Sequence, residues 1–212
     1  MGSLVLARHA TTVAAATGRN LGRRTDAELT PAGHELARRL GTALREELTE
    51  LPHDDLRLIS SPALRCRQTA SAIAAALDLP AERLETAEGL WEIDYGDWDG
   101  LTPEQCDDRD PELRARWEAD PYAVACPAGE SGADVAARAF ADLEPIEAWL
   151  SVDRARCAIV VAHNHVNRLR LCALMGWPMR DYRRRVQQDP GSYSIIGFGG
   201  DVPVIRRVNA AP

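Results

Sequence analysis

The sequence predicts an α/β fold of three layers, in which helices cover both faces of a central, mostly parallel sheet. Short apolar runs alternate along the chain with segments of helical periodicity, which is the pattern of a parallel sheet with crossover helices. The run over 158–162 is the most apolar of them and is typical of a central strand. Two strand-like stretches flank Gly199-Gly200 near the C-terminus, so we expect a hairpin and an antiparallel edge.

The first half of the chain is punctuated by two helix starts. Thr30 is a favoured N-cap, and Pro31 suits the first helical position because its missing N–H has no partner there. Ser61-Pro62 has the same form, and we expect it to cap a second helix that ends near residue 77. The remaining elements expected here are strands over 4–8 and 56–60 and a short extended piece over 88–91.

The second half contains a polar, Pro-punctuated segment over 101–130. One or two short helices fit there, and we expect the segment to be an insertion that caps a pocket rather than part of the core. The whole chain, 1–212, is expected to form a single domain, since one core of this size is ordinary. The other expected elements are helices over 134–150 and 164–175, a strand over 158–162, and hairpin strands over 193–198 and 203–208.

Composition excludes several classes of function. A net charge of −7 disfavours nonspecific binding to nucleic acid or to anionic membranes. The chain contains no Lys, so any anion site must use Arg, His or backbone amides. Five Cys, with no C-x-x-C pair, favour reduced thiols and a cytoplasmic protein. No signal peptide or membrane-spanning stretch is recognised. The sequence leaves open whether the protein forms a homodimer.

Four segments place polar residues where the predicted strands end. In open α/β sheets, ligands bind at the carboxyl edge of the parallel strands. A His beside an Arg at this edge pairs a nucleophile with a fork for phosphate oxygens. The four segments are Arg8-His9, 60–70 with Arg65, 90–100 with Glu92, and 161–165 with His163.

Together these segments resemble the histidine phosphatase superfamily, the phosphoglycerate-mutase-like fold. The resemblance covers nearly the whole chain in the right order, and it includes Gly22 with 26–33 and Gly129-Glu130-Ser131. The stretch Gly96-Asp97-Trp98-Asp99-Gly100 looks like the phosphatase branch of the family. The resemblance implies a phosphatase that hydrolyses a small phosphorylated metabolite without a metal or any other cofactor.

The resemblance also assigns roles. His9 would be the nucleophile that becomes phosphorylated, and Glu92 the acid that protonates the leaving group. Arg8 and Arg65 would grip the phosphoryl oxygens, and His163 would donate to them. Positioning and charge neutralisation of this kind are the main requirements of phosphoryl transfer.

Thr12 and Asn164 are implied as further phosphate-binding residues, and the chain departs from the family pattern nearby. Ala10 replaces the usual Gly after the nucleophile, so the loop must accept a Cβ atom. Ala15 replaces an Asn that often binds phosphate, and Asn20 or Arg19 is a candidate to compensate. Asn164 replaces a Gly and could cap the following helix, whose N-terminus would face the phosphate.

Each site residue also has an ordinary structural interpretation. Arg65 could be an exposed helix residue, Glu92 one more solvated carboxylate beside Asp94, Asp97 and Asp99, and His163 a buried structural His. Arg183-Arg184-Arg185 reads as a solvated face that could instead rim the pocket. His34 and His53 are expected at the surface, and the Trp residues at 91, 98 and 149 are expected to pack in the core.

Two other functions stay open from the sequence. A phosphoglycerate-mutase-type phosphotransferase shares the catalytic core, and a catalytically weak module that binds phosphorylated ligands shares the fold. The string His163-Asn164-His165 invites a metal-nuclease interpretation, but no carboxylate-rich metal motif accompanies it and the net charge is wrong for DNA. The identity of the leaving group is not encoded in any motif.

Overall fold

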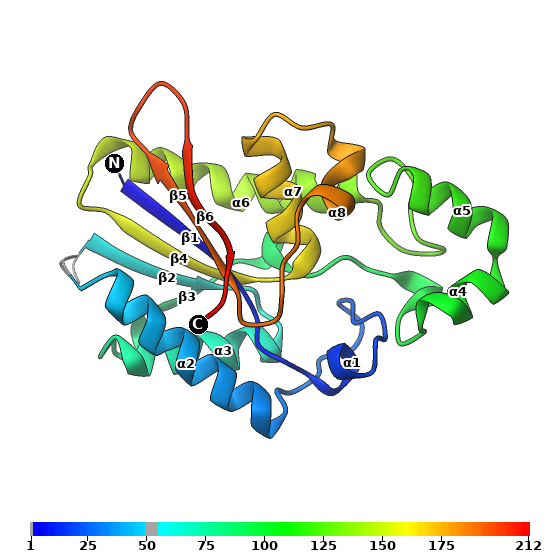
Figure 1. Cartoon of the computed structure of the whole chain (residues 1–212), viewed down its shortest axis with the longest axis horizontal. Helices are drawn as coiled ribbons and strands as arrows, with labels where there is room; N and C mark the ends of the chain where they lie inside the picture. Colours follow the sequence, from blue (N-terminus) through cyan, green and yellow to red (C-terminus); the bar gives the residue numbers. More distant parts are fainter. Residues whose placement is uncertain (1, 50–54) are drawn as a thin grey trace.

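The α/β fold predicted from the sequence is confirmed. In this computed structural model, which describes residues 2–49 and 55–212, six strands form one sheet in the order β3-β2-β4-β1-β5-β6 (Figure 1). The first four strands in this order are parallel, and the last two are antiparallel to their neighbours. The strands are β1 (Gly2–Arg8), β2 (Leu56–Ser60), β3 (Leu84–Thr86), β4 (Cys157–Ala162), β5 (Tyr193–Phe198) and β6 (Val204–Ala210).

Strand β4 is central, as its apolar sequence predicts, and all six of its residues are buried. It lies between β1 and β2, with Arg8 opposite Ala162 in the register and Ser60 opposite Val161. The carboxyl ends of the three strands therefore meet at one edge of the sheet. The residues that follow these strands start close together in space.

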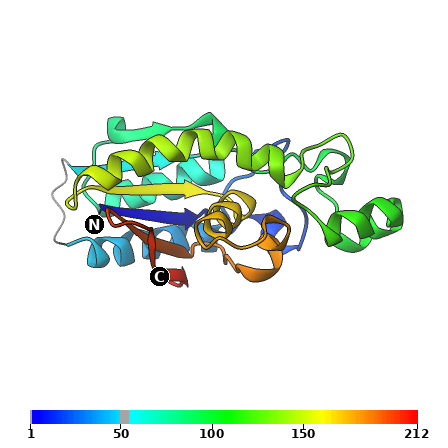
Figure 2. The same cartoon turned by 90° about the horizontal axis from the view of Figure 1, so that it is seen from above.

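Helices cover both faces of the sheet (Figures 1 and 2). Alternate residues of β1 point to opposite faces: Leu4 and Leu6 join one core, and Val5 and Ala7 join the other. The first core packs against α6 (Gly132–Val152) and α7 (Asn164–Leu174), and the second against α2 (Pro31–Glu47) and α3 (Leu64–Ala76). The short helices are α1 (Val13–Ala16), α4 (Pro103–Arg109), α5 (Pro111–Ala119) and α8 (Tyr182–Arg185).

One of the two predicted helix starts is correct. Thr30 is the N-cap of α2, and its hydroxyl accepts a hydrogen bond from the Gly33 amide at 2.9 Å. The prediction that Ser61-Pro62 caps α3 is wrong, because the helix begins at Leu64 and no side chain of its own loop caps it. The carboxylate of Asp26 accepts from the Leu64 amide at 2.6 Å instead. Asp26, which is distant in sequence, thus takes the place of an N-cap side chain. The Ser61 hydroxyl is left to contact a different residue.

The prediction of an extended piece over 88–91 is also wrong. The strand here is β3, and residues Glu88–Leu90 form a single 3₁₀ turn. The carboxylate of Asp142 on α6 accepts a hydrogen bond from the Gly89 amide at 2.7 Å, which draws this turn onto the helix and away from the sheet.

Residues 101–130, called the insertion below, contain α4 and α5 and lie beyond the end of the sheet (Figures 1 and 2). Its base is closed by backbone hydrogen bonds: the Asp97 amide donates to the Pro127 carbonyl and the Glu130 amide to the Asp94 carbonyl, each at 2.8 Å. Gly96 has φ of +56°, and a Cβ atom there would meet the Pro127 carbonyl oxygen at 1.9 Å. Only glycine fits at this junction.

The described residues bear on three further expectations. All five Cys are free and buried. His34 on α2 is exposed, whereas His53 lies outside the described residues. Among the helices of residues 2–49 and 55–212, none combines the length and the apolar character that crossing a bilayer requires.

Candidate active site

The ends of β1 and β4 bring two histidines together. His9 follows β1, and its backbone amide donates to the carbonyl of Ala162, the last residue of β4, at 3.0 Å. His163 comes next after Ala162, and the two imidazole rings stand edge to face with centroids 5.2 Å apart. The parallel pairing of two neighbouring strands is therefore what creates this pair.

His9 is held in one orientation and in one protonation state. Its Nδ1 lies 2.8 Å from the carbonyl oxygen of Ala10, which accepts the Nδ1 proton and leaves Nε2 as the basic nitrogen. Burial lowers the pKa of His9 well below 6.5, and the nearby Arg65 and Arg8 guanidinium groups lower it further. A neutral imidazole with a free Nε2 lone pair is a nucleophile.

His163 is fully buried, and its Nε2 is hydrogen-bonded to the hydroxyl of Ser61 at 2.8 Å. Ser61 can make this contact because Asp26, and not Ser61, accepts the hydrogen bond from the first amide of α3. Burial lowers the pKa of His163 well below 6.5, with Arg65 the next contribution, so this ring is also neutral. Cys66 lies 3.5 Å from the same ring nitrogen, and burial raises the pKa of its thiol to about 12. Cys66 is thus a packing residue with a protonated, unreactive thiol.

Two guanidinium groups flank His9. Arg65 on α3 is fully buried, so its interpretation as an exposed helix residue is wrong, whereas its neighbour Arg67 is exposed. Its Nη2 donates to the Gly22 carbonyl at 3.1 Å, and its Nη1 donates to the Thr25 carbonyl at 3.3 Å. Arg8 donates from Nη1 to the Gln188 carbonyl at 2.5 Å. Backbone carbonyls therefore fix both forks before any anion binds.

Glu92 differs from the other carboxylates of its segment. It is 4% exposed, whereas Asp97 is on the surface, so the interpretation of Glu92 as a solvated carboxylate is wrong. Burial raises the pKa of Glu92 above 4.5, against the opposing effects of the Ile93 amide, which donates to it at 3.0 Å, and of Arg65. A carboxyl group with a raised pKa can hold a proton closer to neutral pH.

Arg138 on α6 fixes the Glu92 segment, and nothing in the sequence singled it out. Its guanidinium donates to the carbonyls of Gly89 and Trp91, each at 2.6 Å, and to that of Glu92 at 3.1 Å. Glu130 accepts from the same guanidinium at 2.9 Å and from the Asp94 amide at 2.9 Å. The position of the acid is thus set by an α6 residue whose role depends on tertiary contacts alone.

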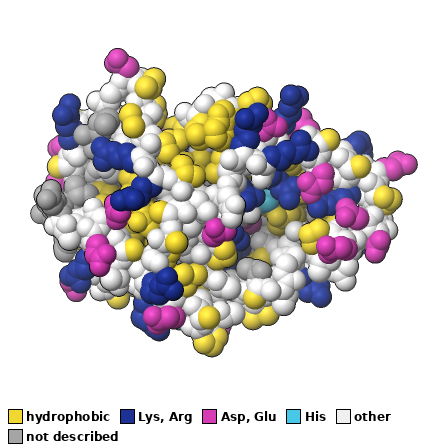
Figure 3. All heavy atoms as spheres, viewed as in Figure 1, with side chains coloured by type: hydrophobic (Ala, Val, Ile, Leu, Met, Phe, Trp, Pro, Cys, Tyr) yellow, Lys and Arg dark blue, Asp and Glu magenta, His cyan; other side chains and the backbone are white. Residues whose placement is uncertain are grey.

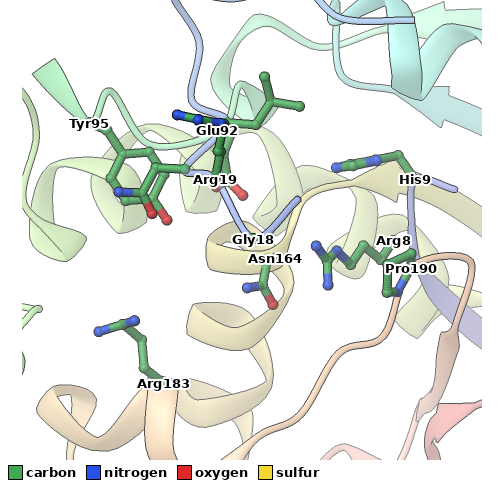
Figure 4. A pocket seen from close by; sticks show the side chains of 11 residues that line it. Arg8, His9, Gly18, Arg19, Glu92, Tyr95, Asn164, Arg183 and Pro190 are labelled. Carbon is green, nitrogen blue, oxygen red and sulfur yellow. The ribbon is translucent and has the colours of Figure 1, made fainter. Parts of the chain in front are cut away.

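A cavity of about 320 Å³ opens at this edge of the sheet. Figure 3 shows a hollow beside the insertion, with a histidine visible in it and arginine side chains gathered around it. Of the predicted site residues, Arg8, His9, Glu92 and Asn164 line the cavity, and Figure 4 shows them around one space. Arg65, His163 and Thr12 are fully buried and do not line it. The remaining lining residues are Gly18, Arg19, Asn20, Leu21, Tyr95, Arg183 and Pro190.

Residues 4–211 match the family model described as the histidine phosphatase superfamily, branch 1. The chain belongs to the histidine phosphatase superfamily. Phosphoserine phosphatase 1 of Hydrogenobacter thermophilus is 31% identical to it over 99% of this chain and 92% of that protein. Glucosyl-3-phosphoglycerate phosphatase of Mycolicibacterium vanbaalenii is 27% identical over 94% and 92%.

Solved structures agree with the sequence matches. The structure of a mycobacterial glucosyl-3-phosphoglycerate phosphatase with VO₃ superposes with a TM-score of 0.84 at 25% identity, over 99% of this chain and 100% of that one. A structure named mycobacterial hydrolase 1 superposes with a TM-score of 0.85, which shows that the two chains share a fold. Their sequences are 24% identical. The protein is a phosphatase of the histidine phosphatase type.

The departures from the histidine phosphatase pattern are accommodated around His9. Ala10 is buried and is not among the residues with positive φ, so its Cβ atom causes no backbone strain. The Ala10 amide donates to the hydroxyl of Thr69 on α3 at 3.1 Å. Gly33 of α2 packs so closely that a Cβ atom would meet the Thr11 carbonyl oxygen at 2.1 Å. The loop after His9 is thus held between α2 and α3.

Asn164, Arg19 and Asn20 all reach the cavity but differ in what they offer it. The N-cap of α7 is His163, so the prediction that Asn164 caps this helix is wrong by one residue. The Oδ1 atom of Asn164 is buried without a hydrogen-bond partner in the described part of the chain. The Asn20 side-chain amide donates to the Trp98 carbonyl at 3.2 Å, and Arg19 donates to the Gly100 carbonyl at 2.7 Å. Both are committed to the base of the insertion.

Aromatic residues build the wall between the cavity and the insertion. Trp98 is buried in the core, Trp91 and Trp149 pack against it partly buried, and none of the three lines the cavity. Tyr95 does, and its hydroxyl is hydrogen-bonded to Nε2 of His165 at 2.8 Å. The Tyr182 hydroxyl lies 2.6 Å from Nδ1 of the same ring. The backbone amide of His165 donates to Glu92 at 3.4 Å, so this residue supports the acid from behind.

Within residues 2–49 and 55–212, no group of three or more His, Cys, Asp and Glu side chains is arranged to hold a metal ion. The cations at this site are the arginines.

Proposed function

We propose that the protein is a metal-independent phosphomonoesterase that acts through a phosphohistidine intermediate on His9. The state of His9 carries the proposal. Its imidazole is neutral, its Nδ1 proton is held by the Ala10 carbonyl, and the residue lines the cavity, so Nε2 is the nitrogen left to attack. The neighbouring Arg8 and buried Glu92 supply the charge and the proton that the reaction requires.

In the first step, Nε2 of His9 attacks phosphorus while the bond from phosphorus to the ester oxygen breaks. Glu92 gives its proton to that oxygen, so an alcohol rather than an alkoxide departs. In the second step, water attacks the phosphohistidine, Glu92 takes the proton from water, and the bond between phosphorus and Nε2 breaks. Free phosphate leaves, and both residues return to their starting states.

The arginines stabilise the charge on the transferring group. Arg8 and Arg65 are proposed to neutralise the phosphoryl oxygens, with further donation from His163, Asn164 and Thr12. Arg8 lines the cavity directly, and Arg65 acts on His9 from its buried position. Fixed donors of this kind cost no reorganisation during the reaction. Such donors perform the neutralisation that a metal ion performs in other phosphotransferases.

The substrate is proposed to be a small phosphate monoester that enters beside the insertion. Residues 101–130 are proposed to cap the cavity and to select the leaving group. The names of the relatives offer two starting substrates, phosphoserine and glucosyl-3-phosphoglycerate. Sugar phosphates and nucleotides complete the panel with which to screen for phosphate release.

The final acceptor is expected to be water. The protein, assayed in EDTA and without 2,3-bisphosphoglycerate, should release phosphate from p-nitrophenyl phosphate and from at least one member of the panel. With 3-phosphoglycerate, any formation of 2-phosphoglycerate should be negligible beside phosphate release. Interconversion faster than phosphate release would place the protein with the mutases. Loss of activity in EDTA that zinc or magnesium restores would contradict metal independence.

The pH dependence should be displaced toward acid. The pKa of His9 lies well below 6.5, so His9 stays an unprotonated nucleophile as the pH falls. The pKa of Glu92 is raised above 4.5, and the proton that the leaving group needs is lost as the pH rises through that pKa. For an alkyl phosphate, kcat/KM should therefore fall on the alkaline side, and Glu92→Gln should flatten that fall. An alkaline limb of the same shape in the variant would assign the limb to the substrate, whose phosphate also titrates at a pKa of about 6.

A further inference from the structure

A second pocket adjoins the catalytic cavity and is walled by arginine. It has a volume of about 300 Å³ and is called the arginine pocket below. Arg8 and Arg183 line both spaces, so the two are neighbours with a shared wall. The residues of the arginine pocket are Arg8, Arg168, Arg183, Arg184, Val186, Gln187, Gln188 and Asp189.

Arg168 is the unmatched cation of this pocket. It lies on α7, one turn after Asn164, and its Nε is buried without a hydrogen-bond partner in the described part of the chain. No carboxylate in residues 2–49 and 55–212 forms an ion pair with it. Burial lowers the pKa of Arg168, and the charges of Arg8 and Arg183 lower it further, against smaller opposing effects of Tyr95 and Glu92. Arg168 is thus a half-buried guanidinium with two other guanidinium groups nearby and no carboxylate paired to it in the described residues.

Arg183 is held in place by the insertion. Its Nη1 donates to the carboxylate of Glu118 on α5 at 2.9 Å, and its guanidinium lies 4.1 Å from the centre of the Trp117 ring. Glu118 also pairs with Arg114 at 2.6 Å, and Arg114 has a second carboxylate partner in Asp107 at 3.1 Å. Figure 4 shows Arg183 extending from α8 toward the space that Arg8 and Asn164 also face. The side chain is thus ordered before an anion binds, which lowers the entropic cost of binding.

The charges of the two pockets do not balance for a simple phosphate ester. A phosphoryl dianion is matched by Arg8 and Arg65, and Arg183 is paired with Glu118. Arg168 and Arg184 have no carboxylate paired to them in the described part of the chain and stay in excess. On the arginine pocket's wall, the one carboxylate among the described residues is Asp189. Hydrogen bonds from Gln187 and Asn209 lower the pKa of Asp189, so its single negative charge is present but insufficient. In a chain with a net charge of −7, this excess of positive charge is local.

We propose that the arginine pocket binds a second anionic group on the leaving-group side of the substrate, a carboxylate or a second phosphate, through Arg168 and Arg183. The proposal rests on the phosphatase function proposed above and names the class of its substrate. A substrate of this class spans both pockets, with its phosphoryl group at His9 and its second anion beside Arg168. Guanidinium forks suit either anion, because both present paired oxygens.

The test compares esters that differ only in the second group. For the carboxylate, 3-phosphoglycerate is compared with glycerol 3-phosphate; for the phosphate, 1,3-propanediol bisphosphate is compared with propyl phosphate. The measured quantity is the ratio of kcat/KM within each pair. The wild-type ratio should exceed about 10 in at least one pair, and the pair in which it does so identifies the anion. Arg168→Met and Arg183→Met should each lower that ratio by about 10-fold, toward 1, as expected for losing a hydrogen bond to a charged group.

Arg180→Met is the matched control, since Arg180 is exposed and lies outside both pockets. It should keep the wild-type ratio. A variant that folds poorly lowers both members of a pair and leaves the ratio unchanged, so a ratio that Arg168→Met and Arg183→Met do not move overturns the proposal. Hydrolysis of p-nitrophenyl phosphate separates the two proposals. If the wild type releases phosphate from it but shows no preference within either pair, the arginine pocket proposal fails and the phosphatase function stands.

Discussion

Replacing His9 with Ala is expected to abolish phosphate release from every substrate. The reaction requires a nucleophile at the carboxyl end of β1, and the buried neighbours cannot substitute for it. His163 gives its Nε2 to Ser61, and burial raises the pKa of the Cys66 thiol to about 12. Removing the nucleophile of a covalent hydrolase can cost on the order of 10⁶-fold in rate. The measurement is kcat for p-nitrophenyl phosphate, with His34→Ala on the exposed face of α2 as the matched control.

Trapping the intermediate identifies the atom that attacks. Wild-type protein quenched rapidly without acid should carry phosphate on His9, in a linkage that is labile to acid and stable to base. The His9→Ala protein should carry none, although its circular dichroism should match that of the wild type. Phosphate recovered on a serine or an aspartate would overturn the proposed mechanism.

Replacing Glu92 with Gln should have the second largest effect, and its size should depend on the leaving group. An alkyl phosphate needs a proton on its departing oxygen, whereas p-nitrophenolate leaves without one. General acid catalysis is typically worth about 10²- to 10⁴-fold, so kcat/KM for the alkyl ester should fall by that factor and that for the nitrophenyl ester by much less. The use of kcat/KM restricts the comparison to steps up to phosphorylation, so the second role of Glu92 in hydrolysing the phosphoenzyme does not enter.

Glu82→Gln is the control for this substitution, because Glu82 is exposed in a 3₁₀ turn before β3. It should leave both esters at the wild-type rate. Equal losses on the two esters in Glu92→Gln would mean that Glu92 positions the substrate rather than protonating it. The Gln side chain also removes the negative charge that faces Arg65. Glu92→Asp is therefore a useful second variant, because it keeps a carboxyl group on a shorter side chain.

The sheet and the place of its catalytic edge could be predicted from the sequence because both depend on local patterns. The apolar run of β4 indicates a buried central strand, and polar residues directly after β1 and β4 must then share an edge. Strand ends alone place His9 and His163 at this edge, whereas the prediction that Arg65 and Glu92 join them depends on the resemblance to the histidine phosphatases. Their chemical roles stay predictions until the substitutions are made.

The failures share a physical cause, which is that a distant residue provides the partner. Ser61 has the sequence of an N-cap, yet Asp26 caps α3 and Ser61 turns to His163. The stretch after β3 looks extended, yet Asp142 and Arg138 of α6 hold it in a turn. The run Arg183-Arg184-Arg185 looks solvated in sequence, yet the Arg183 side chain is 25% exposed because it stacks on Trp117, and it lines the cavity. None of these partners is near in sequence to the residue that it holds.

The closed base joins the backbone of the insertion to the rest of the molecule at a single junction. Backbone hydrogen bonds join Asp97 to Pro127 and Asp94 to Glu130, so the chain leaves the body and returns to it at nearly one point. Arg138 fixes the acid's segment from α6, below this junction. The side chains of the insertion cross this junction, because Trp117 of α5 lies in the main core beside Tyr95 and His165. A change in α5 can therefore reach Glu92 through the His165 amide, even though the backbone of the insertion is joined to the body at one place.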